Sequence, residues 1–209
     1  MLGLYVPNLN TKECTLTLTF LIVFRYPEDN EHYRTNFLLD QILYESIVGD
    51  IFNTNSFTLF PSSMPNLREC CPNGIKPQVG FDFIFADDGY AEKKVDYIID
   101  IRDVSKGGQR SRTNVKRNMI PRSDIFYEDF CPTRTTLAHE FGHGPLELDH
   151  PGTGIIDPKT ELPYERNSPE EYSHTGKDQY GRDVSKDDLM GYGSGLRQFY
   201  FDLWNNWSM

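Results

Sequence analysis

The chain has 209 residues, and its 31 acidic against 21 basic side chains give a net charge of −10. This charge argues against binding to nucleic acid, which needs a basic surface to neutralise phosphates. No apolar run reaches the roughly 18 residues of a membrane span, and residues 1–11 lack the basic start of a secretory signal peptide. The length and a 38% hydrophobic content predict a single folded domain.

The first two thirds of the chain predict a sheet with one backing helix. Thr15–Tyr26 alternates and is rich in β-branched residues, which indicates a strand. Apolar residues recur near the helical period in Arg34–Phe52, and this predicts an amphipathic helix. Pro61–Pro77 is interrupted by proline and glycine, as in an irregular connection. Two apolar runs, Val79–Ala86 and Val95–Val104, flank a turn-forming Asp-Asp-Gly, so we expect two strands paired as a hairpin.

The last part of the chain mixes loops with two predicted helices. Ser105–Arg122 is basic without a hydrophobic period and is expected to be a surface loop, or else a rim facing a substrate or partner. Pro132–His143 predicts a helix with Pro132 in its first turn, or with Thr135 or Thr136 as the cap of a later start, and the Gly-Pro dipeptide that follows ends it. Gly152–Asp188 is expected to be mostly loop, and Leu196–Trp204 a closing aromatic helix.

The four cysteines, Cys14, Cys70, Cys71 and Cys131, match no zinc knuckle or redox motif. Buried or free thiols are one interpretation. The other is one or two disulfides that involve Cys14 or Cys131, which would require an oxidising compartment. The spacing leaves both open.

The segment His139-Glu140-Phe141-Gly142-His143 has the pattern of a zinc site. On a helix its two histidines are one turn apart, so both imidazoles leave the same face and can bind one Zn²⁺ at about 2.0–2.1 Å. Glu140 is turned by about 100° from the first histidine. It would therefore lie beside the metal, where a general base must be to deprotonate a water at the metal. We expect zinc as the cofactor.

The residues that follow, Leu-Glu-Leu-Asp-His-Pro at 146–151, carry a resemblance to the metzincin clan of zinc peptidases. The motif of that clan is H-E-x-x-H-x-x-G-x-x-H. Here the third histidine comes one residue late, and Leu or Glu replaces the glycine of the turn, so we expect Gly144 to serve that turn. The resemblance implies His150 or Asp149 as the third metal ligand. We favour His150, because imidazole is the commoner zinc ligand.

A second part of the resemblance is the downstream segment Asp-Leu-Met-Gly-Tyr-Gly at 188–193. Metzincins have a methionine turn below the metal, which implies that Met190 forms a polarizable floor under the histidines. Tyr192 stands two residues later, as in the astacin-like and serralysin-like branches. The resemblance implies that Tyr192 reaches the metal or the oxyanion as a catalytic residue.

The His-Glu-Phe-Gly-His motif, the acidic turn, the Leu-Met-Gly segment and the aromatic end are also similar to metallopeptidase modules of secreted Rhs and VgrG effectors and toxins. This likeness implies an action outside the producing cytosol, through secretion or dedicated delivery. It also raises an immunity or inhibitor protein as a partner.

Together these resemblances imply an α+β fold with one zincin-like domain over residues 1–209. A twisted mixed sheet and backing helix would occupy 1–131, and the zinc-site helix, loop, methionine turn and closing helix 132–209. The implied activity is that of a zinc-dependent metalloendopeptidase acting on a protein or peptide substrate, which an edge strand, Val95–Val104 or Val79–Ala86, would bind by β-augmentation. The alternatives are a zinc amidase or peptidase for cell-wall peptides and a non-catalytic metal-binding interaction module.

Other candidate residues fit simpler interpretations. His174 is expected to be a loop histidine, with donation to the transition state as its alternative. Asp178-Gln179-Tyr180-Gly181 resembles the D-x-x-Y-G motif of aspzincins but is one residue shorter. Four glutamates that could supply a gluzincin-type ligand look like an ordinary solvated face: Glu161, Glu165, Glu170 and Glu171.

Overall fold

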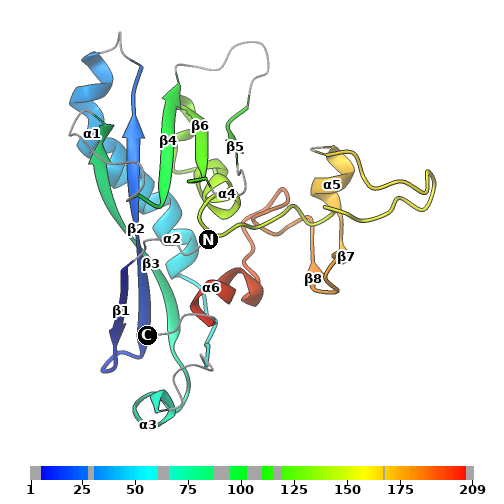
Figure 1. Cartoon of the computed structure of the whole chain (residues 1–209), viewed down its shortest axis with the longest axis horizontal. Helices are drawn as coiled ribbons and strands as arrows, with labels where there is room; N and C mark the ends of the chain where they lie inside the picture. The colour runs from blue at the N-terminus through cyan, green and yellow to red at the C-terminus, as the bar shows by residue number, and fades with distance from the viewer. Residues whose placement is uncertain are drawn as a thin grey trace.

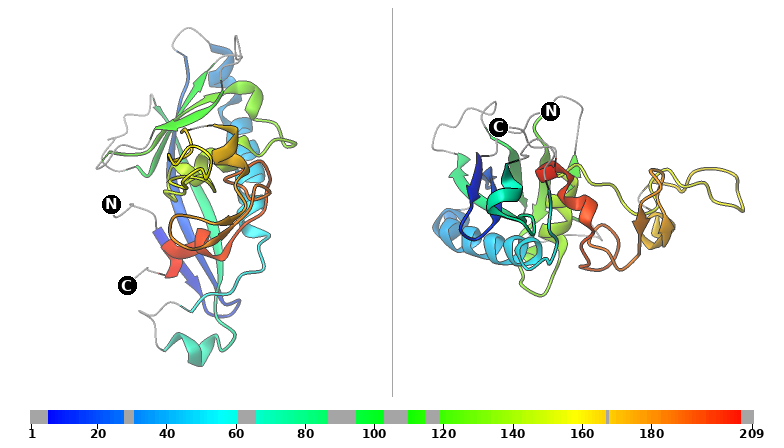
Figure 2. Two further views of the ribbon diagram at one scale, coloured as in Figure 1. Left: turned by 90° about the vertical axis from the view of Figure 1, so that its right-hand side faces the viewer. Right: turned by 90° about the horizontal axis from the view of Figure 1, so that it is seen from below.

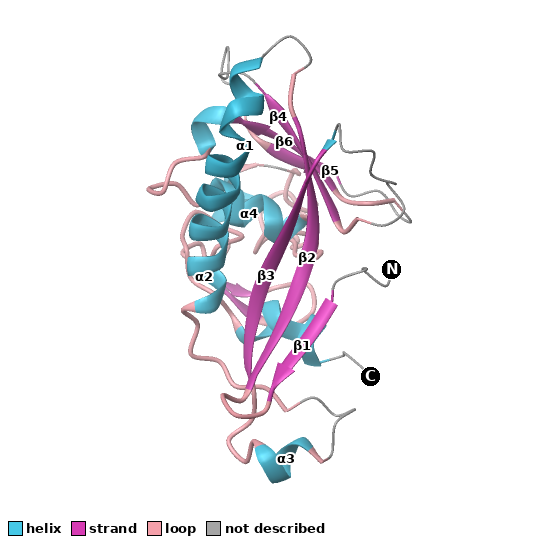
Figure 3. Cartoon of the chain, turned by 90° about the vertical axis from the view of Figure 1, so that its left-hand side faces the viewer, coloured by secondary structure: helices cyan, strands magenta, loops and turns pink. Residues whose placement is uncertain are grey.

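A mixed sheet with helices packed on one face forms the body of the molecule (Figures 1 and 3). The computed structural model describes residues 6–27, 31–60, 66–86, 95–102, 110–114, 119–166 and 168–205, and for 31–35 the backbone alone. Helices and strands both contribute, in agreement with the expected α+β class.

The described strands of the main sheet are β1 (Val6–Asn10), β2 (Thr15–Arg25), β3 (Lys76–Phe85), β4 (Tyr97–Arg102), β5 (Arg112–Asn114) and β6 (Arg122–Phe126). β2 pairs with β1 along its first residues and with β4 along its last ones, and β3 pairs with the opposite edge of β2. β6 and then β5 follow β4. β3 and β4 run parallel to β2, and β6 runs parallel to β4. β1 and β5 are antiparallel to their neighbours.

Alternation along β2 explains its central place in the sheet. Its even-numbered residues from Leu16 to Phe24 are at most 1% exposed and face the helices. On the opposite face, Val23 packs with Val95 and Ile98 in a second apolar cluster. The strand expected over Thr15–Tyr26 is therefore confirmed, and it is buried along one face and at Val23 on the other.

The helix expected over Arg34–Phe52 is also confirmed. Helix α1 (Glu31–Tyr44) continues through a π-helical turn (Glu45–Gly49) into α2 (Asp50–Asn53). Helix α4 (Thr136–His143) lies on the same face of the sheet (Figure 3). It starts later than predicted, at Thr136, because residues 132–133 form a turn; Thr135 takes the N-cap position without a side-chain capping hydrogen bond, and the helix ends at the predicted residue.

Phe141 fixes α4 against the sheet and the backing helix. Its ring centroid lies 5.2 Å from that of Phe20 on β2, 5.4 Å from Phe52 on α2 and 5.6 Å from Phe81 on β3, all edge to face. Such aromatic pairs add to the free energy gained by burial. Phe141, midway between the two motif histidines in the sequence, thus anchors the helix that carries them.

The hairpin expected from Val79–Ala86 and Val95–Val104 is wrong. β3 and β4 lie on opposite sides of β2, and both run parallel to it. Buried parallel strands read as continuous apolar runs, so their composition does not reveal which strand pairs with which. The turn expected between them falls in residues 87–94, outside the described residues.

The segment after α4 extends away from the sheet before the chain returns to it (Figures 1 and 2). It is mostly loop, as expected, with a short helix and a two-stranded ribbon inside it. The expected closing helix begins as a 3₁₀ turn (Gln198–Phe201). The remaining short elements are α3 (Leu67–Cys70), a 3₁₀ turn (Tyr127–Asp129), α5 (Pro169–Ser173), β7 (Gly176–Lys177), β8 (Asp183–Val184) and α6 (Asp202–Asn205). None of the helices in the described ranges is long and apolar enough for a membrane crossing.

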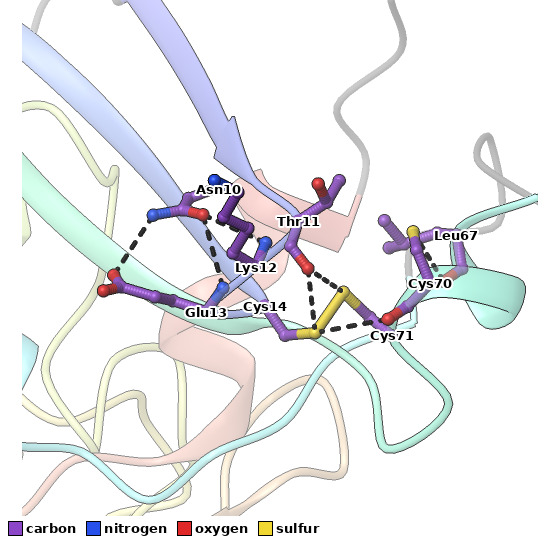
Figure 4. The surroundings of a disulfide bond; sticks show 8 residues. All are labelled: Asn10, Thr11, Lys12, Glu13, Cys14, Leu67, Cys70 and Cys71. Carbon is purple, nitrogen blue, oxygen red and sulfur yellow. Dashed lines mark hydrogen bonds between the residues drawn. A yellow bond between two sulfur atoms is a disulfide. The ribbon is translucent and has the colours of Figure 1, made fainter.

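A disulfide between Cys14 and Cys71 joins the β1–β2 turn to the segment that follows α3 (Figure 4). Cys70 and Cys131 are free, with Cys70 exposed and Cys131 partly exposed. The disulfide interpretation therefore holds for Cys14 and Cys71, and the free-thiol interpretation holds for Cys70 and Cys131.

Removal of the disulfide is expected to lower the free energy of unfolding by about 2–4 kcal/mol, because the bridge restricts the unfolded chain across a sequence separation of 57. For a chain of this size the unfolding midpoint of Cys14→Ala/Cys71→Ala should fall by roughly 4–16 °C. Differential scanning calorimetry measures the shift, with Cys70→Ala as the control. Equal midpoints in the double variant and wild type would contradict a bridge in solution.

Candidate metal centre

Three histidine side chains converge at the end of α4. His139 and His143 project from consecutive turns of the helix, and His150 comes from the loop after it. The Nε2 atom of His143 lies 3.1 Å from Nε2 of His139 and 2.8 Å from Nε2 of His150. Among the described residues these three form a group whose ligand atoms all lie within 4.8 Å of one another, close enough to hold a metal ion.

Backbone carbonyls set the orientation of the two helical histidines. Nδ1 of His139 lies 2.7 Å from the carbonyl oxygen of Leu189, and Nδ1 of His143 lies 2.7 Å from that of Leu148. A carbonyl oxygen only accepts hydrogen bonds, so each Nδ1 must carry the proton and donate it. Each Nε2 is then left with a lone pair directed into the centre.

The third histidine is oriented by a carboxylate instead. Nδ1 of His150 lies 3.2 Å from Oε2 of Glu171, and the other carboxylate oxygen accepts a hydrogen bond of 2.7 Å from the hydroxyl of Thr153. His150 and Glu171 are 7% and 4% exposed, so this contact is shielded from water. Outer partners of this kind fix the tautomer of a metal-binding imidazole.

The donor set fits a metal cation. With all three Nδ1 atoms engaged outward, three Nε2 lone pairs face one another, which is unfavourable unless a cation lies between them. A proton is a poor choice, because burial and the charge of a neighbouring imidazole lower the pKa of His139 and of His143 to about 4. The pKa of His150 is lowered for the same two reasons. The imidazoles are therefore neutral near pH 7, as metal ligands must be.

The structure distinguishes the two rivals for the third position. His150 is buried within the cluster, while Asp149 is exposed and lies outside the metal-binding group. The placement of His150 agrees with the preferred prediction.

The turn before His150 begins at Gly144, as expected, and the carbonyl oxygen of Gly144 accepts the N–H of Glu147 at 3.2 Å. Gly144 has a φ of −75°, and it is Glu147 that adopts the left-handed conformation, with a φ of 52°. Gly144 is required for space instead, because a Cβ atom there would lie 2.7 Å from the ring of Tyr97. Gly144 therefore serves the turn, but Glu147 supplies its left-handed conformation, and glycine is needed at 144 for space.

Glu140 is held beside the histidines by the edge strand β5. Its side chain is 6% exposed, and Oε2 accepts a hydrogen bond of 2.6 Å from the hydroxyl of Thr113. Burial raises the pKa of Glu140 to about 7, against the lowering effect of the Thr113 hydrogen bond. The hydroxyl of Tyr97 donates to the carbonyl oxygen of Glu140 at 3.2 Å, which ties the same turn of α4 to β4.

The edge strand next to α4 differs from both predicted segments. Val95–Val104 contains β4, which is an interior strand, and Val79–Ala86 lies mostly in β3, at the other side of β2. β5 comes instead from Ser105–Arg122, which was expected to be a surface loop and is only partly described. Three polar residues give no alternation signal, and short, charged edge strands are common because they resist aggregation.

Met190 and Tyr192 lie in different surroundings. Met190 is fully buried below α4, and a Cβ atom on Gly142 would lie 2.5 Å from its sulfur. Tyr192 is 59% exposed, and its hydroxyl donates to the carbonyl oxygen of Pro169 at 3.4 Å. Its ring stacks on Tyr172 at a centroid distance of 5.4 Å and not on a histidine.

Helix α5 supplies Tyr172, which the sequence did not single out, and Glu171, which was named only among four glutamates expected on a solvated face. Tyr172 places its ring 3.8 Å from that of His150, centroid to centroid. The solvated face expected at Glu171 is wrong, because this carboxylate is buried against His150. One signal was present: Ser168 and Glu171 match the start of a capping box, and the Ser168 hydroxyl accepts from the backbone N–H of Glu171 at 3.3 Å.

The remaining candidates lie outside the metal-binding group. Nε2 of His174 contacts the carbonyl oxygen of Lys177 at 2.9 Å within a local turn. Asp178 caps its own turn and pairs with Arg182 at 2.7 Å. Three of the four glutamates are exposed, as expected: Glu161, Glu165 and Glu170.

Comparison with known protein families and with curated proteins finds no match to the chain. What this site can do is therefore inferred from its geometry and from the motif resemblance.

Proposed function

We propose that the chain is a zinc-dependent metalloendopeptidase with a metzincin-like, zincin-type domain. One observation carries the proposal: three imidazole Nε2 atoms converge, each with its Nδ1 held from outside, and the buried carboxylate of Glu140 follows the first ligand directly.

Zinc is the metal that this donor set fits best, because it favours imidazole nitrogen and tetrahedral geometry. Two nitrogens at tetrahedral positions around one zinc ion lie about 3.3 Å apart, close to the 3.1 Å and 2.8 Å between the Nε2 atoms. His139, His143 and His150 would hold the zinc ion, which would supply a Lewis acid and would lower the pKa of a water molecule bound to it.

In the proposed mechanism, Glu140 transfers the proton during hydrolysis and Thr113 positions Glu140. Glu140 accepts a proton from the attacking water, whose oxygen bonds to the carbonyl carbon of the scissile peptide. Glu140 then delivers this proton to the amide nitrogen as the C–N bond breaks, and the products are a carboxylate and an amine. Thr113 holds Glu140 in place for both transfers.

The surroundings of the site support a peptide substrate. β5 lies at the edge of the sheet next to α4, and its Thr113 touches Glu140. An edge strand offers unpaired backbone groups to an extended peptide, as the metzincin resemblance implies. Met190, packed under α4, suits the role of the methionine turn.

The disulfide supports action outside the producing cytosol, because such bonds persist mainly in oxidising compartments. Together with the resemblance to effector modules, it favours a secreted effector or toxin, for which an immunity or inhibitor protein would be a partner.

The test is elemental mass spectrometry of the purified protein, combined with casein hydrolysis before and after treatment with 1,10-phenanthroline. We expect close to one zinc per chain, loss of hydrolysis with the chelator and recovery when zinc is restored. Zinc without casein hydrolysis, but with cleavage of cell-wall peptides, would favour the amidase alternative. A wild-type protein that takes up no zinc would refute the proposal.

A further inference from the structure

Tyr172 is held rigidly between the third histidine and the methionine turn. The residue before it, Glu171, contacts His150 through its carboxylate, and its carbonyl oxygen accepts the N–H of Gly152 at 2.8 Å. On the other side, a Cβ atom on Gly191 would lie 2.9 Å from the carbonyl oxygen of Tyr172. The backbone of α5 at Tyr172 is therefore fixed relative to both segments.

The ring of Tyr172 is stacked against the histidine cluster. Its centroid lies 3.8 Å from the ring of His150 and 5.9 Å from that of His139, and it is within 16° of parallel to the latter. The ring of Tyr192 stacks on it at 5.4 Å. These contacts leave the ring little freedom to turn away from the metal centre.

The hydroxyl of Tyr172 has no hydrogen-bond partner within the described chain, unlike the hydroxyl of Tyr192, which donates to Pro169. The side chain is half-buried, but its hydroxyl is not among the buried polar atoms without a partner, so it is open to water or to a ligand. A phenol has an ordinary pKa of about 10 and carries its proton at neutral pH. A rigid ring beside the metal centre thus carries a hydroxyl donor that has no acceptor in the described part of the chain.

We infer that Tyr172, and not Tyr192, donates a hydrogen bond to the carbonyl oxygen of a substrate at this centre. As water attacks, that oxygen gains negative charge, and a hydrogen bond from a fixed donor becomes stronger than it was in the ground state. No proton is transferred by Tyr172. The assignment rests on the proposed function and adds the residue that stabilises the charge.

The variant Tyr172→Phe removes the hydroxyl and keeps the ring that packs on His150. We expect zinc content and KM to stay at wild-type values while kcat falls by about 10²–10³-fold, as for the loss of one oxyanion donor. Tyr180→Phe is the matched control, because Tyr180 is 64% exposed and its ring lies against Arg182. Loss of zinc in Tyr172→Phe, or an unchanged kcat, would overturn the assignment, as would a larger loss in Tyr192→Phe.

A binding measurement separates this inference from the proposed function. The protein is loaded with Co²⁺, and its visible absorption follows binding of acetohydroxamate, whose carbonyl oxygen stands for that of a substrate. Tyr172→Phe is expected to weaken binding about tenfold, and Tyr180→Phe to leave it unchanged. A wild type that binds the probe with this dependence on Tyr172 but hydrolyses no peptide would refute the peptidase and support the donor. Equal affinities in Tyr172→Phe and wild type would refute the donor alone.

Discussion

Glu140→Gln is expected to lower peptide hydrolysis by about 10²–10⁴-fold, because glutamine cannot accept the proton of the attacking water. The amide is nearly the same size as the carboxylate, so the packing of α4 should survive. Since Glu140 is not among the metal-binding histidines, the zinc content should not change. Steady-state kinetics and elemental analysis on one protein batch measure both quantities.

Glu147→Gln is the control for this experiment, since Glu147 is the next glutamate along the chain and is exposed. It should retain the wild-type rate. If Glu140→Gln kept full activity with zinc bound, the general base would have to be another residue, and the proposed mechanism would be wrong.

His150→Ala is expected to weaken zinc binding by more than about a hundredfold, since loss of a ligand costs more than the 10–100-fold caused by loss of an outer partner. Asp149→Ala should bind zinc like the wild type, because Asp149 is exposed and stands apart from the three imidazoles. Competition with a chromophoric chelator measures the affinities. The opposite order, with zinc lost only in Asp149→Ala, would move the third ligand by one residue.

Glu171→Gln provides an intermediate case in the same series. The amide can still contact His150 and Thr153 but loses the negative charge that favours a proton on Nδ1 of His150. Its zinc affinity should fall by about 10–100-fold. A variant indistinguishable from wild type would show that Glu171 only fills space.

The parts of the site that could be predicted from sequence are those set by local geometry. His139, Glu140 and His143 lie on one short helix, so the helical period alone determines their relation. Glu171 and Thr113 could not be predicted, because they reach the site through tertiary packing. In a linear reading Glu171 is one more acidic residue in a polar loop.

The fold shows the same division. Periodicity predicted β2, whose apolar alternation matches its burial. It also predicted the long helix, although Leu38 and Ile42 of its apolar pattern are exposed and Asp40 is buried. It could not predict that β3 and β4 flank β2 in parallel, because pairing depends on where the connections cross. β5 is three residues long and polar, and it is a strand only because β6 lies beside it.

The outward partners of the three histidines all come after the helix in the chain: Leu148, Glu171 and Leu189. During synthesis, His139 and His143 are therefore made well before Leu189, whose carbonyl oxygen orients His139. In a nascent chain that ends before Leu189, this carbonyl oxygen is missing and does not fix the tautomer of the His139 imidazole. The metal centre can therefore be completed only after Leu189 has been synthesised and its carbonyl oxygen lies against His139.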